Sequence, residues 1–470
     1  MTQFPGRTVG VALALGVLAA RSSAQEPVAE ARALLKTIVE INSTHERGST
    51  TPIARLLAGR FTAAGFPAAD VQVLGPGPRK QNLVVRWRAA ASTQKPILFI
   101  SHLDVVEAKR EDWATDPFKF VEKDGYYYAR GIWDDKAAVT TWVTGLISLR
   151  KEGWKPSRDI ILILTADEEA GTEDGVEWLL KNHRPLVDAE FAINGDGGGP
   201  ELHGGKVTVV RVEPAEKNSV FYKFSVTNAG GHSSRPRADN AIYQLSNALA
   251  RLERYHFPAQ LSELQRAGLQ KAIETMTPAM VTAARAFLAN PSDAAAATTL
   301  AADPEFNAML RTTCVATELT GGHARNALPQ LASATVNCRI LPGVTPDAML
   351  GQLRTIIADT VVHIGYEQPP RPSADASPIR ADYLDPILGA AKAVWGQSVT
   401  LQPALSIGAS SGIYTRAAGI PTYSVMHIPY DFSDMRAHGR DERISAKAFD
   451  ESVVFARKLI RAYGDVRLVP

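Results

Sequence analysis

Short apolar runs alternate with helical patterns along the first part of the chain. The runs are rich in β-branched and aromatic residues and are bounded by polar turns, and apolar residues recur at helical spacing between them. After a helical stretch over Pro27–Gly65, the predicted strands are Leu83–Trp87, Pro96–Ile100, Asp159–Leu164 and Phe191–Asn194, and the predicted helices are Lys136–Arg150 and Gly175–His183. This alternation predicts an α/β domain with a largely parallel sheet.

The pattern changes from about Asn218. The new elements are a strand at Phe221–Val226, a proline-broken helical region over Asn240–Leu310, strands at Thr312–Leu319 and Ala332–Leu341, and a helix at Thr345–Val362. After the proline-rich stretch Pro369–Pro372, an α/β pattern resumes with Asp382–Trp395, Pro421–Met426 and Ser445–Tyr463. We therefore expect a catalytic domain over residues 25–216 and 371–470, interrupted by an α+β domain over 217–370.

Size and composition narrow the class of protein. A chain of 470 residues is too long for one ordinary core, which favours two domains. With 45% apolar and 21% charged residues, the composition is that of a soluble globular enzyme and argues against disorder. A formal charge of +2 is too small to indicate nucleic-acid binding.

The N-terminus has the pattern of a signal peptide. Arg7 precedes the apolar stretch Val9–Ala20, which is followed by the small residues Ser22, Ser23 and Ala24. An uncleaved anchor or a buried helix is the alternative, but the stretch is short for a membrane span. We therefore expect residues 1–24 to be removed and the mature protein to be secreted or periplasmic, without a membrane anchor.

The chain has two cysteines, Cys314 and Cys338, in strands that are expected to pair. Export would permit a disulfide between them. Two buried free thiols are an equally good interpretation, and neither cysteine has the surroundings of a catalytic nucleophile.

A histidine and an aspartate follow the predicted strand Pro96–Ile100. Residues i and i+2 of a strand point to the same side, so His102 and Asp104 can point together. A carboxylate often fixes the second ring nitrogen of a metal-bound histidine. A structural His–Asp pair is the alternative.

Two acidic clusters lie near other element ends. Of the paired residues Asp134 and Asp135, one could hold two cations with its two oxygens, although aspartate is also a common helix N-cap. The run Asp167–Glu169 ends an apolar strand, where neighbouring acids repel each other and are costly to desolvate unless a cation compensates them. A solvated loop is the alternative for this run.

Asp196 and His438 are the remaining candidates. Asp196 lies in the glycine-rich turn Asn194–Gly199, where backbone can approach a site closely, although a plain flexible turn would look the same. His438 alone would be unremarkable. Two histidines and several carboxylates together suit zinc, with manganese or cobalt as alternatives, and leave a carboxylate to act as general base.

In order and spacing these motifs resemble the dizinc family of aminoacylase, carnosinase, glutamate carboxypeptidase and succinyl-diaminopimelate desuccinylase. The matching motifs are Ser101–Asp104, Gly131–Lys136, Glu168–Glu169, Asp196 and His438. The resemblance implies a zinc-exopeptidase-like catalytic domain, an inserted α+β lid that carries dimerisation, two Zn²⁺ ions per chain and a homodimer.

The resemblance also implies a ligand set. His102 and His438 would each bind one zinc ion, and Asp134 would bridge the two. Asp196 would be a further ligand of the zinc ion bound by His102, and Glu169 a further ligand of the zinc ion bound by His438.

Further roles follow from the same resemblance. Glu168 would be the general base, Asp104 would orient His102, and His232, in the lid motif Gly230–Ser234, would stabilise the developing oxyanion. The implied substrate-binding residues are Asn326 and Arg339 of the lid, and Gly408, Ser410 and Ser411 of a glycine-rich loop.

The sequence departs from the family at positions that affect the shape of the substrate site. Ile132 and Trp133 replace small residues, Ala137 stands where glycine is common, and Gly412 stands where an aspartate is frequent. We predict hydrolysis of an amide bond in a small peptide, of the carboxypeptidase or dipeptidase type. An N-acyl amino acid amidohydrolase is the alternative, and a metal-free binding protein on the same fold is a more remote one.

Overall fold

The computed structural model describes residues 26–170, 173–274 and 276–465 of the chain. It divides into two compact units. The first unit runs to Val210 and includes Arg380–Leu401 and the segment from Ser424, whereas the second comprises Arg211–Ile379 and Gln402–Tyr423. The predicted architecture, an α/β domain interrupted by an α+β domain, is confirmed.

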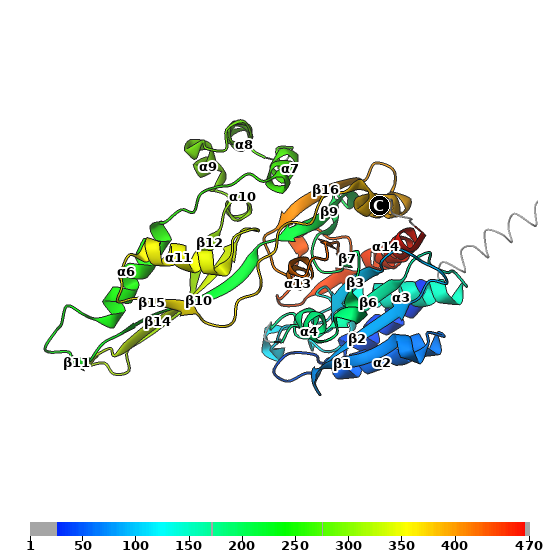
Figure 1. The fold of residues 1–470 in the computed structure, drawn as a ribbon, viewed down its shortest axis with the longest axis horizontal. Coiled ribbons are helices and arrows are strands. Elements are labelled where there is room, and N and C mark those ends of the chain that lie inside the picture. Colours follow the sequence, from blue (N-terminus) through cyan, green and yellow to red (C-terminus); the bar gives the residue numbers. More distant parts are fainter. Residues whose placement is uncertain (1–25, 171–172, 275, 466–470) are drawn as a thin grey trace, which may run out of the picture. The chain divides into compact units, whose positions relative to one another are not determined.

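A nine-stranded sheet organises the first unit (Figure 1). Its order is β1-β2-β6-β3-β7-β17-β9-β16, with β8 beside β9. The strands are β1 (Val71–Gly77), β2 (Lys80–Trp87), β3 (Ile97–His102), β6 (Ile160–Thr165), β7 (Phe191–Asn194), β8 (Gly199–His203), β9 (Lys206–Glu216), β16 (Thr400–Ser406) and β17 (Thr422–Ser424). The chain passes between the two units within β9, β16 and β17, and also between Ile379 and Arg380. Strand β3 pairs in parallel with β6 and β7, and β3 and β6 are buried throughout, which explains their continuous apolar sequences.

Helices cover this sheet. They are a helix over 26–39, α2 (Thr51–Ala63), α3 (Lys136–Lys151), α4 (Gly175–Asn182), α5 (Arg184–Val187), α12 (Ala381–Trp395) and α14 (Ala446–Asp465). Helix α3 packs against β3 and α14, and it is buried from Lys136 to Leu149. A small sheet of β4 (Val121–Lys123), β5 (Tyr126–Tyr128) and β18 (Arg443–Ser445) joins the last segment of the chain to the first.

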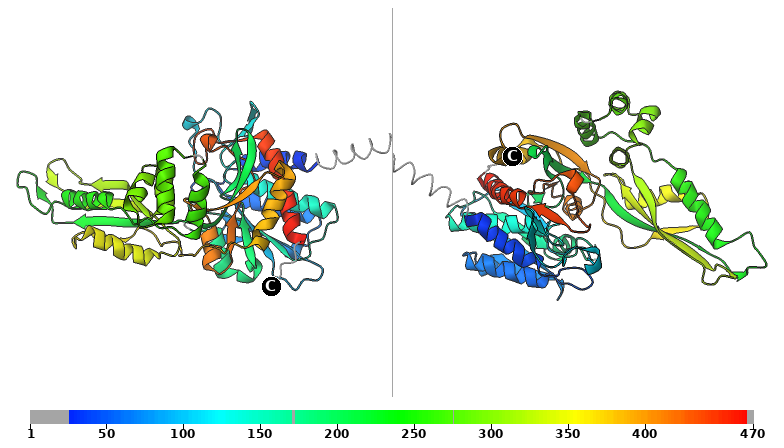
Figure 2. Two further views of the ribbon diagram at one scale, coloured as in Figure 1. Left: turned by 90° about the horizontal axis from the view of Figure 1, so that it is seen from above. Right: turned by 180° about the vertical axis from the view of Figure 1, so that it is seen from behind.

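The second unit is built on a four-stranded antiparallel sheet of order β12-β14-β10-β15 (Figure 2). Its elements are β10 (Asn218–Thr227), β11 (Gly231–His232), α6 (Ala241–Arg254), α7 (Glu263–Ala272), α8 (Pro278–Ala289), α9 (Ala294–Leu300), α10 (Pro304–Leu310), β12 (Thr313–Gly321), β13 (Ala327–Leu328), β14 (Leu331–Ile340), α11 (Pro346–Ile357), β15 (His363–Tyr366) and α13 (Gly412–Ala417). Buried and half-buried residues alternate along β10, and its buried face shares one core with α6 and α11. Helices α7 to α10 enclose a small core of their own.

The structure refines the predicted elements of this region. The helical stretch over Asn240–Leu310 consists of five helices, two of which begin at Pro278 and Pro304, because proline fits the first turn of a helix. The predicted helix over Thr345–Val362 ends earlier, at Ile357, and β15 follows it. Strands β1, β8, β9 and β16 of the large sheet were not predicted.

The signal-peptide prediction falls on residues 1–24, outside the described residues. Within the described ranges, no helix has both the length and the apolar character that crossing a bilayer requires.

Cys314 and Cys338 form a disulfide in the second unit. They lie directly opposite each other on β12 and β14. From the sequence, a disulfide and two free thiols were equally good interpretations, because the register in which two strands pair cannot be read from their positions alone.

We predict that reducing the disulfide destabilises the protein. The bridge closes a loop between two residues with a sequence separation of 24. Because this loop restricts the unfolded chain, the bridge stabilises the folded protein by about 3 kcal/mol. Chemical denaturation with and without reductant should show an earlier transition when the bridge is reduced. A variant with both cysteines replaced by serine should already have the earlier transition and should not respond to reductant. Equal midpoints for the oxidised and reduced protein would contradict the prediction.

Candidate metal centre

Three adjacent parallel strands end at one edge of the large sheet. Strand β3 ends at His102, which lies opposite Thr165 of β6, and Ile100 of β3 lies opposite Asn194 of β7. The carboxyl ends of parallel strands therefore bring together the loops that carry Glu168, Glu169 and Asp196. This is the edge at which open α/β sheets bind ligands.

Two groups of side chains at this edge could each hold a metal ion. The first group is His102, Asp134 and Asp196, and the second group is Asp134, Glu169 and His438. Within each group the candidate ligand atoms lie within 4.8 Å of one another. Two ligands on a tetrahedral zinc ion are separated by roughly 3.3 Å, given bond lengths of about 2.0–2.2 Å. The donor types and spacing therefore fit zinc.

Asp134 belongs to both groups, and its two oxygens face different histidines. Oδ1 lies 2.8 Å from Nε2 of His102, and Oδ2 lies 3.1 Å from Nε2 of His438. Nε2 of His438 also lies 3.0 Å from a carboxylate oxygen of Glu169. One carboxylate thus presents one oxygen to each group, as a bridging ligand must.

The electrostatics of the two groups are strongly perturbed. Burial raises the pKa of Asp134, but the hydrogen bonds to His102 and His438 outweigh it and hold that pKa below its ordinary value. Hydrogen bonds to Asp134 and Glu169 raise the pKa of His438 to about 10. Burial, followed by repulsion from Asp134, raises the pKa of Glu169 and of Asp196. The site therefore concentrates negative charge that positive charge must compensate.

Asp104 contacts both His102 and the loop that carries the two glutamates. Its backbone carbonyl lies 3.0 Å from Nδ1 of His102, and its carboxylate Oδ1 lies 3.6 Å from the same nitrogen. The carboxylate also accepts hydrogen bonds from the backbone N–H groups of Glu168 and Glu169, at 3.2 and 3.0 Å. Because Nδ1 faces this carbonyl, Nε2 is the ring nitrogen of His102 that could bind a metal ion.

The first residue of the acidic run, Asp167, belongs to neither group. The carboxylate of Asp167 binds Nδ1 of His45 at 2.7 Å and Nζ of Lys80 at 3.0 Å. Asp167 and Glu168 are buried, so this run is not a solvated loop. The ammonium group of Lys80 thus offsets one of the three charges.

Asp135 and Lys136, next to the shared aspartate, are fully buried. The side chain of Asp135 does not cap α3, although the residue stands at the N-cap position, and it instead accepts a hydrogen bond from the backbone N–H of His102 at 3.3 Å. Burial raises the pKa of Asp135 to about 7 and lowers that of Lys136 to about 7. Nζ of Lys136 donates to the carbonyl of Ile41 at 2.9 Å. Neither contact could be predicted from the sequence.

The other expected site residues lie in the second unit. His232 pairs with Ala327 between β11 and β13, and the carbonyl of Asn326 accepts a hydrogen bond from Ser233, so His232 and Asn326 are neighbours. The backbone N–H of Ser234 donates to Nδ1 of His232, which leaves Nε2 to carry the ring proton. Arg339 lies on β14, opposite Ser219 and Thr313.

The loop Gly408–Gly412 is anchored by a buried ion pair of the second unit. Glu216 pairs with Arg416 at 2.7 Å and accepts hydrogen bonds from the backbone N–H and the hydroxyl of Ser410. This anchor fixes the loop that was predicted to bind substrate.

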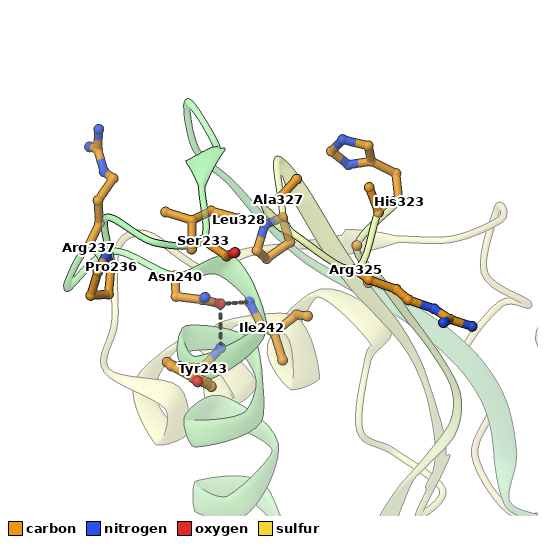
Figure 3. A pocket seen from close by; sticks show the side chains of 14 residues that line it. Ser233, Pro236, Arg237, Asn240, Ile242, Tyr243, His323, Arg325, Ala327 and Leu328 are labelled. Carbon is orange, nitrogen blue, oxygen red and sulfur yellow. Dashed lines mark hydrogen bonds between the residues drawn. The ribbon is translucent and has the colours of Figure 1, made fainter.

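A cavity of about 640 Å³ opens beside the His232 loop (Figure 3). Its lining includes Ser233 and Arg237 from this loop, Tyr243 from α6, and His323 and Arg325 from the turn before β13. The lining thus combines basic and aromatic side chains from three segments of the second unit.

Comparison with known proteins agrees with this arrangement. The model of the peptidase family M20/M25/M40 matches residues 98–462. The N-fatty-acyl-amino acid synthase/hydrolase of Homo sapiens is 29% identical over 464 residues, which cover 93% of this chain and 88% of the relative. A carboxypeptidase S-like protein of Dictyostelium discoideum is 28% identical over 387 residues, covering 81% of this chain and 74% of the relative.

A solved structure shows the same fold. The M20 family metallo-carboxypeptidase of Sulfolobus solfataricus aligns with a TM-score of 0.71 at 18% identity, over 93% of this chain and 99% of that chain. The family match spans well over half of the sequence and includes every candidate metal ligand. The chain therefore belongs to the peptidase family M20/M25/M40.

Proposed function

We propose that the protein is a dizinc amidohydrolase that cleaves an amide bond in a small peptide, as a carboxypeptidase or dipeptidase does. The observation that carries this proposal is the sharing of the Asp134 carboxylate between His102 and His438. The similarity to carboxypeptidases supports the peptide substrate. An N-acyl amino acid is the second candidate, because the human relative is an N-fatty-acyl-amino acid synthase/hydrolase.

The chain's own residues divide the chemistry between them. His102, Asp134 and Asp196 would hold one zinc ion, and Asp134, Glu169 and His438 the other. Zinc bound there would polarise the scissile carbonyl and lower the pKa of the attacking water. The Glu168 carboxylate would accept the proton of that water and deliver it to the leaving nitrogen. Asp104, which binds the backbone of Glu168, would keep the base in place.

The substrate contacts are proposed from the resemblance. Arg339 would bind the free carboxylate of the substrate, Asn326 its carbonyl, and Gly408, Ser410 and Ser411 the remaining backbone. His232 would donate a hydrogen bond to the developing oxyanion, a role that suits the proton on its Nε2.

We also propose that the protein is a secreted or periplasmic homodimer. The pattern of residues 1–24 supports export. Strand β12 is an edge of its sheet, is largely exposed and carries the exposed apolar residues Val315 and Leu319. An edge strand with exposed apolar side chains is suited to pairing with a second copy.

Replacement of the base should separate chemistry from metal binding. We expect Glu168→Gln to lower kcat by about 10²-fold or more, because a general base typically contributes 10²–10⁴-fold. Zinc content, measured by atomic absorption, should stay at that of the unsubstituted protein. Glu177→Gln, which neutralises an exposed glutamate of α4, is the matched control and should change neither quantity. Parallel loss of zinc would identify Glu168 as a ligand.

Replacement of the shared ligand, in contrast, should lower the zinc content as well as the activity. We expect Asp134→Ala to lose at least one zinc ion per chain and nearly all activity, since both groups use this carboxylate. Asp385→Ala, which removes an exposed aspartate of α12, should retain both ions. Full occupancy and activity in the Asp134 variant would disprove the bridging role.

The substrate class can be tested with matched pairs that share one C-terminal residue: a dipeptide, an N-acyl amino acid, and the C-terminal amide of each. We expect the dipeptide acid to be the best substrate and both amides to be poor, because Arg339 would bind the free carboxylate bidentately. Arg339→Lys should lower kcat/KM for the acids strongly, since lysine lacks the fork geometry. Equal cleavage of acid and amide would rule out the carboxylate role.

The dimer proposal includes a site completed by His232 of the partner subunit. Glu168→Gln and His232→Ala should each be nearly inactive as homodimers. Purified mixed dimers, each chain carrying one substitution and a different tag, should recover close to half of the activity, because one of two sites has both residues intact. Mixed dimers that stay inactive would place His232 in its own subunit's site or in none.

A further inference from the structure

One buried carboxylate outside the two metal groups binds the loop that carries the shared aspartate. Glu442 is 1% exposed, and four hydrogen-bond donors converge on it. Its Oε1 accepts from the backbone N–H groups of Trp133 and Asp134, at 2.8 and 3.2 Å. Its Oε2 accepts from the backbone N–H of Gly131 at 3.0 Å and from Nη1 of Arg130 at 2.7 Å. Both oxygens are therefore used to hold the turn before α3.

Arg130 extends this contact to the loop that carries His438. Its Nη2 donates to the carbonyls of His438 and Gly439, at 3.3 and 3.0 Å. His438 follows Arg130 by 308 positions in the sequence. The guanidinium is also buried, and it lies over the ring of Trp113 at 5.1 Å from the centroid. A single ion pair thus holds the backbones of both turns.

The two metal groups differ in how much they need this contact. His102 is part of the buried strand β3, and Asp196 directly follows β7, where the side chain of Asn194 accepts a hydrogen bond from its backbone N–H. The sheet itself therefore positions the first group. His438 lies in a loop, with a left-handed φ of 60° that a non-glycine residue adopts only when its surroundings hold it.

We propose that Glu442 and Arg130 are positioning residues that set the separation between Asp134 and His438, and that zinc binding by the second group depends on them more than zinc binding by the first. The inference rests on the proposed metal roles of these ligands. Neither positioning residue belongs to the two groups of candidate ligands. Each acts on the backbone of a ligand.

The isosteric variant Glu442→Gln tests the proposal. The amide keeps the shape of the carboxylate, but its NH₂ group is a donor and cannot accept a hydrogen bond. The N–H groups that face this NH₂ group therefore lose their acceptor. Arg130→Lys is the second variant: it keeps the charge but cannot bind Glu442 and the two carbonyls at once. It keeps the test open if Glu442→Gln does not fold.

The matched control is Glu190→Gln. Glu190 pairs with the fully buried Arg158 in the same unit and also accepts from the hydroxyl of Tyr383, away from both metal groups. It reports what the loss of a partly buried ion pair does to global stability alone.

The measurement is a zinc titration of the metal-free full-length protein in competition with a chromophoric chelator, which gives one Kd for each zinc ion, together with the Tm of each metal-free variant. For Glu442→Gln and Arg130→Lys we expect one of the two Kd values, which we assign to the second group, to rise by about 10-fold or more, as is typical for partners of metal ligands. The other Kd should stay close to that of the unsubstituted protein. Glu190→Gln should leave both Kd values unchanged, whatever its Tm.

Two results would overturn the inference while leaving the proposed function intact. In one, both variants bind two zinc ions as tightly as the unsubstituted protein. In the other, both positions weaken equally and in proportion to the loss in Tm. Failure of the unsubstituted protein to bind zinc would instead overturn the metal centre itself, together with the inference that rests on it.

Discussion

The carboxylate of Asp134 lies between two imidazoles, and the surrounding structure is arranged about this interaction. Each oxygen faces one histidine, so two distant parts of the chain meet at a single side chain. Glu169 and Asp196 lie close enough to be repelled by Asp134, and burial makes their charged forms still less favourable. Such a cluster is stable only when positive charge compensates it. The histidines provide part of that charge, and under the proposed function two metal ions provide the rest.

Elements could be predicted from the sequence where their pattern of apolar residues matches their burial in the folded protein. Strands β3 and β6 are buried on both faces, so their sequences are continuously apolar and recognisable. Two of the strands that were missed, β1 and β16, are different. In β1 every residue is only half-buried, and β16 is largely so, which leaves little contrast between buried and exposed positions. The proline-broken region was correctly predicted as helical, because proline marks helix starts as well as helix ends.

The site was predictable to the extent that its residues follow strands. His102 and Asp196 lie at or just after the ends of neighbouring strands, and parallel pairing brings such ends together. The contacts made by Asp104 and Asp135 were not predictable in this way. Asp104 binds the backbone of Glu168 and Glu169 as well as facing His102, and Asp135 binds the backbone of His102 instead of capping its own helix. These are long-range contacts between a side chain and a backbone, and no spacing rule in a single sequence reveals them.

The ligands of the second group also lie far apart in the chain. His438 follows Glu169 by 269 positions, and the whole second unit is encoded between them. During synthesis, a chain that has been made as far as β17 contains His102, Asp134 and Asp196 but has neither His438 nor α14, which packs against α3. The first unit therefore cannot be finished until the unit inserted within it has been made. Under the proposed function, the second metal position is completed only after the last segment has docked, so binding of the second ion would mark a chain whose two ends have met.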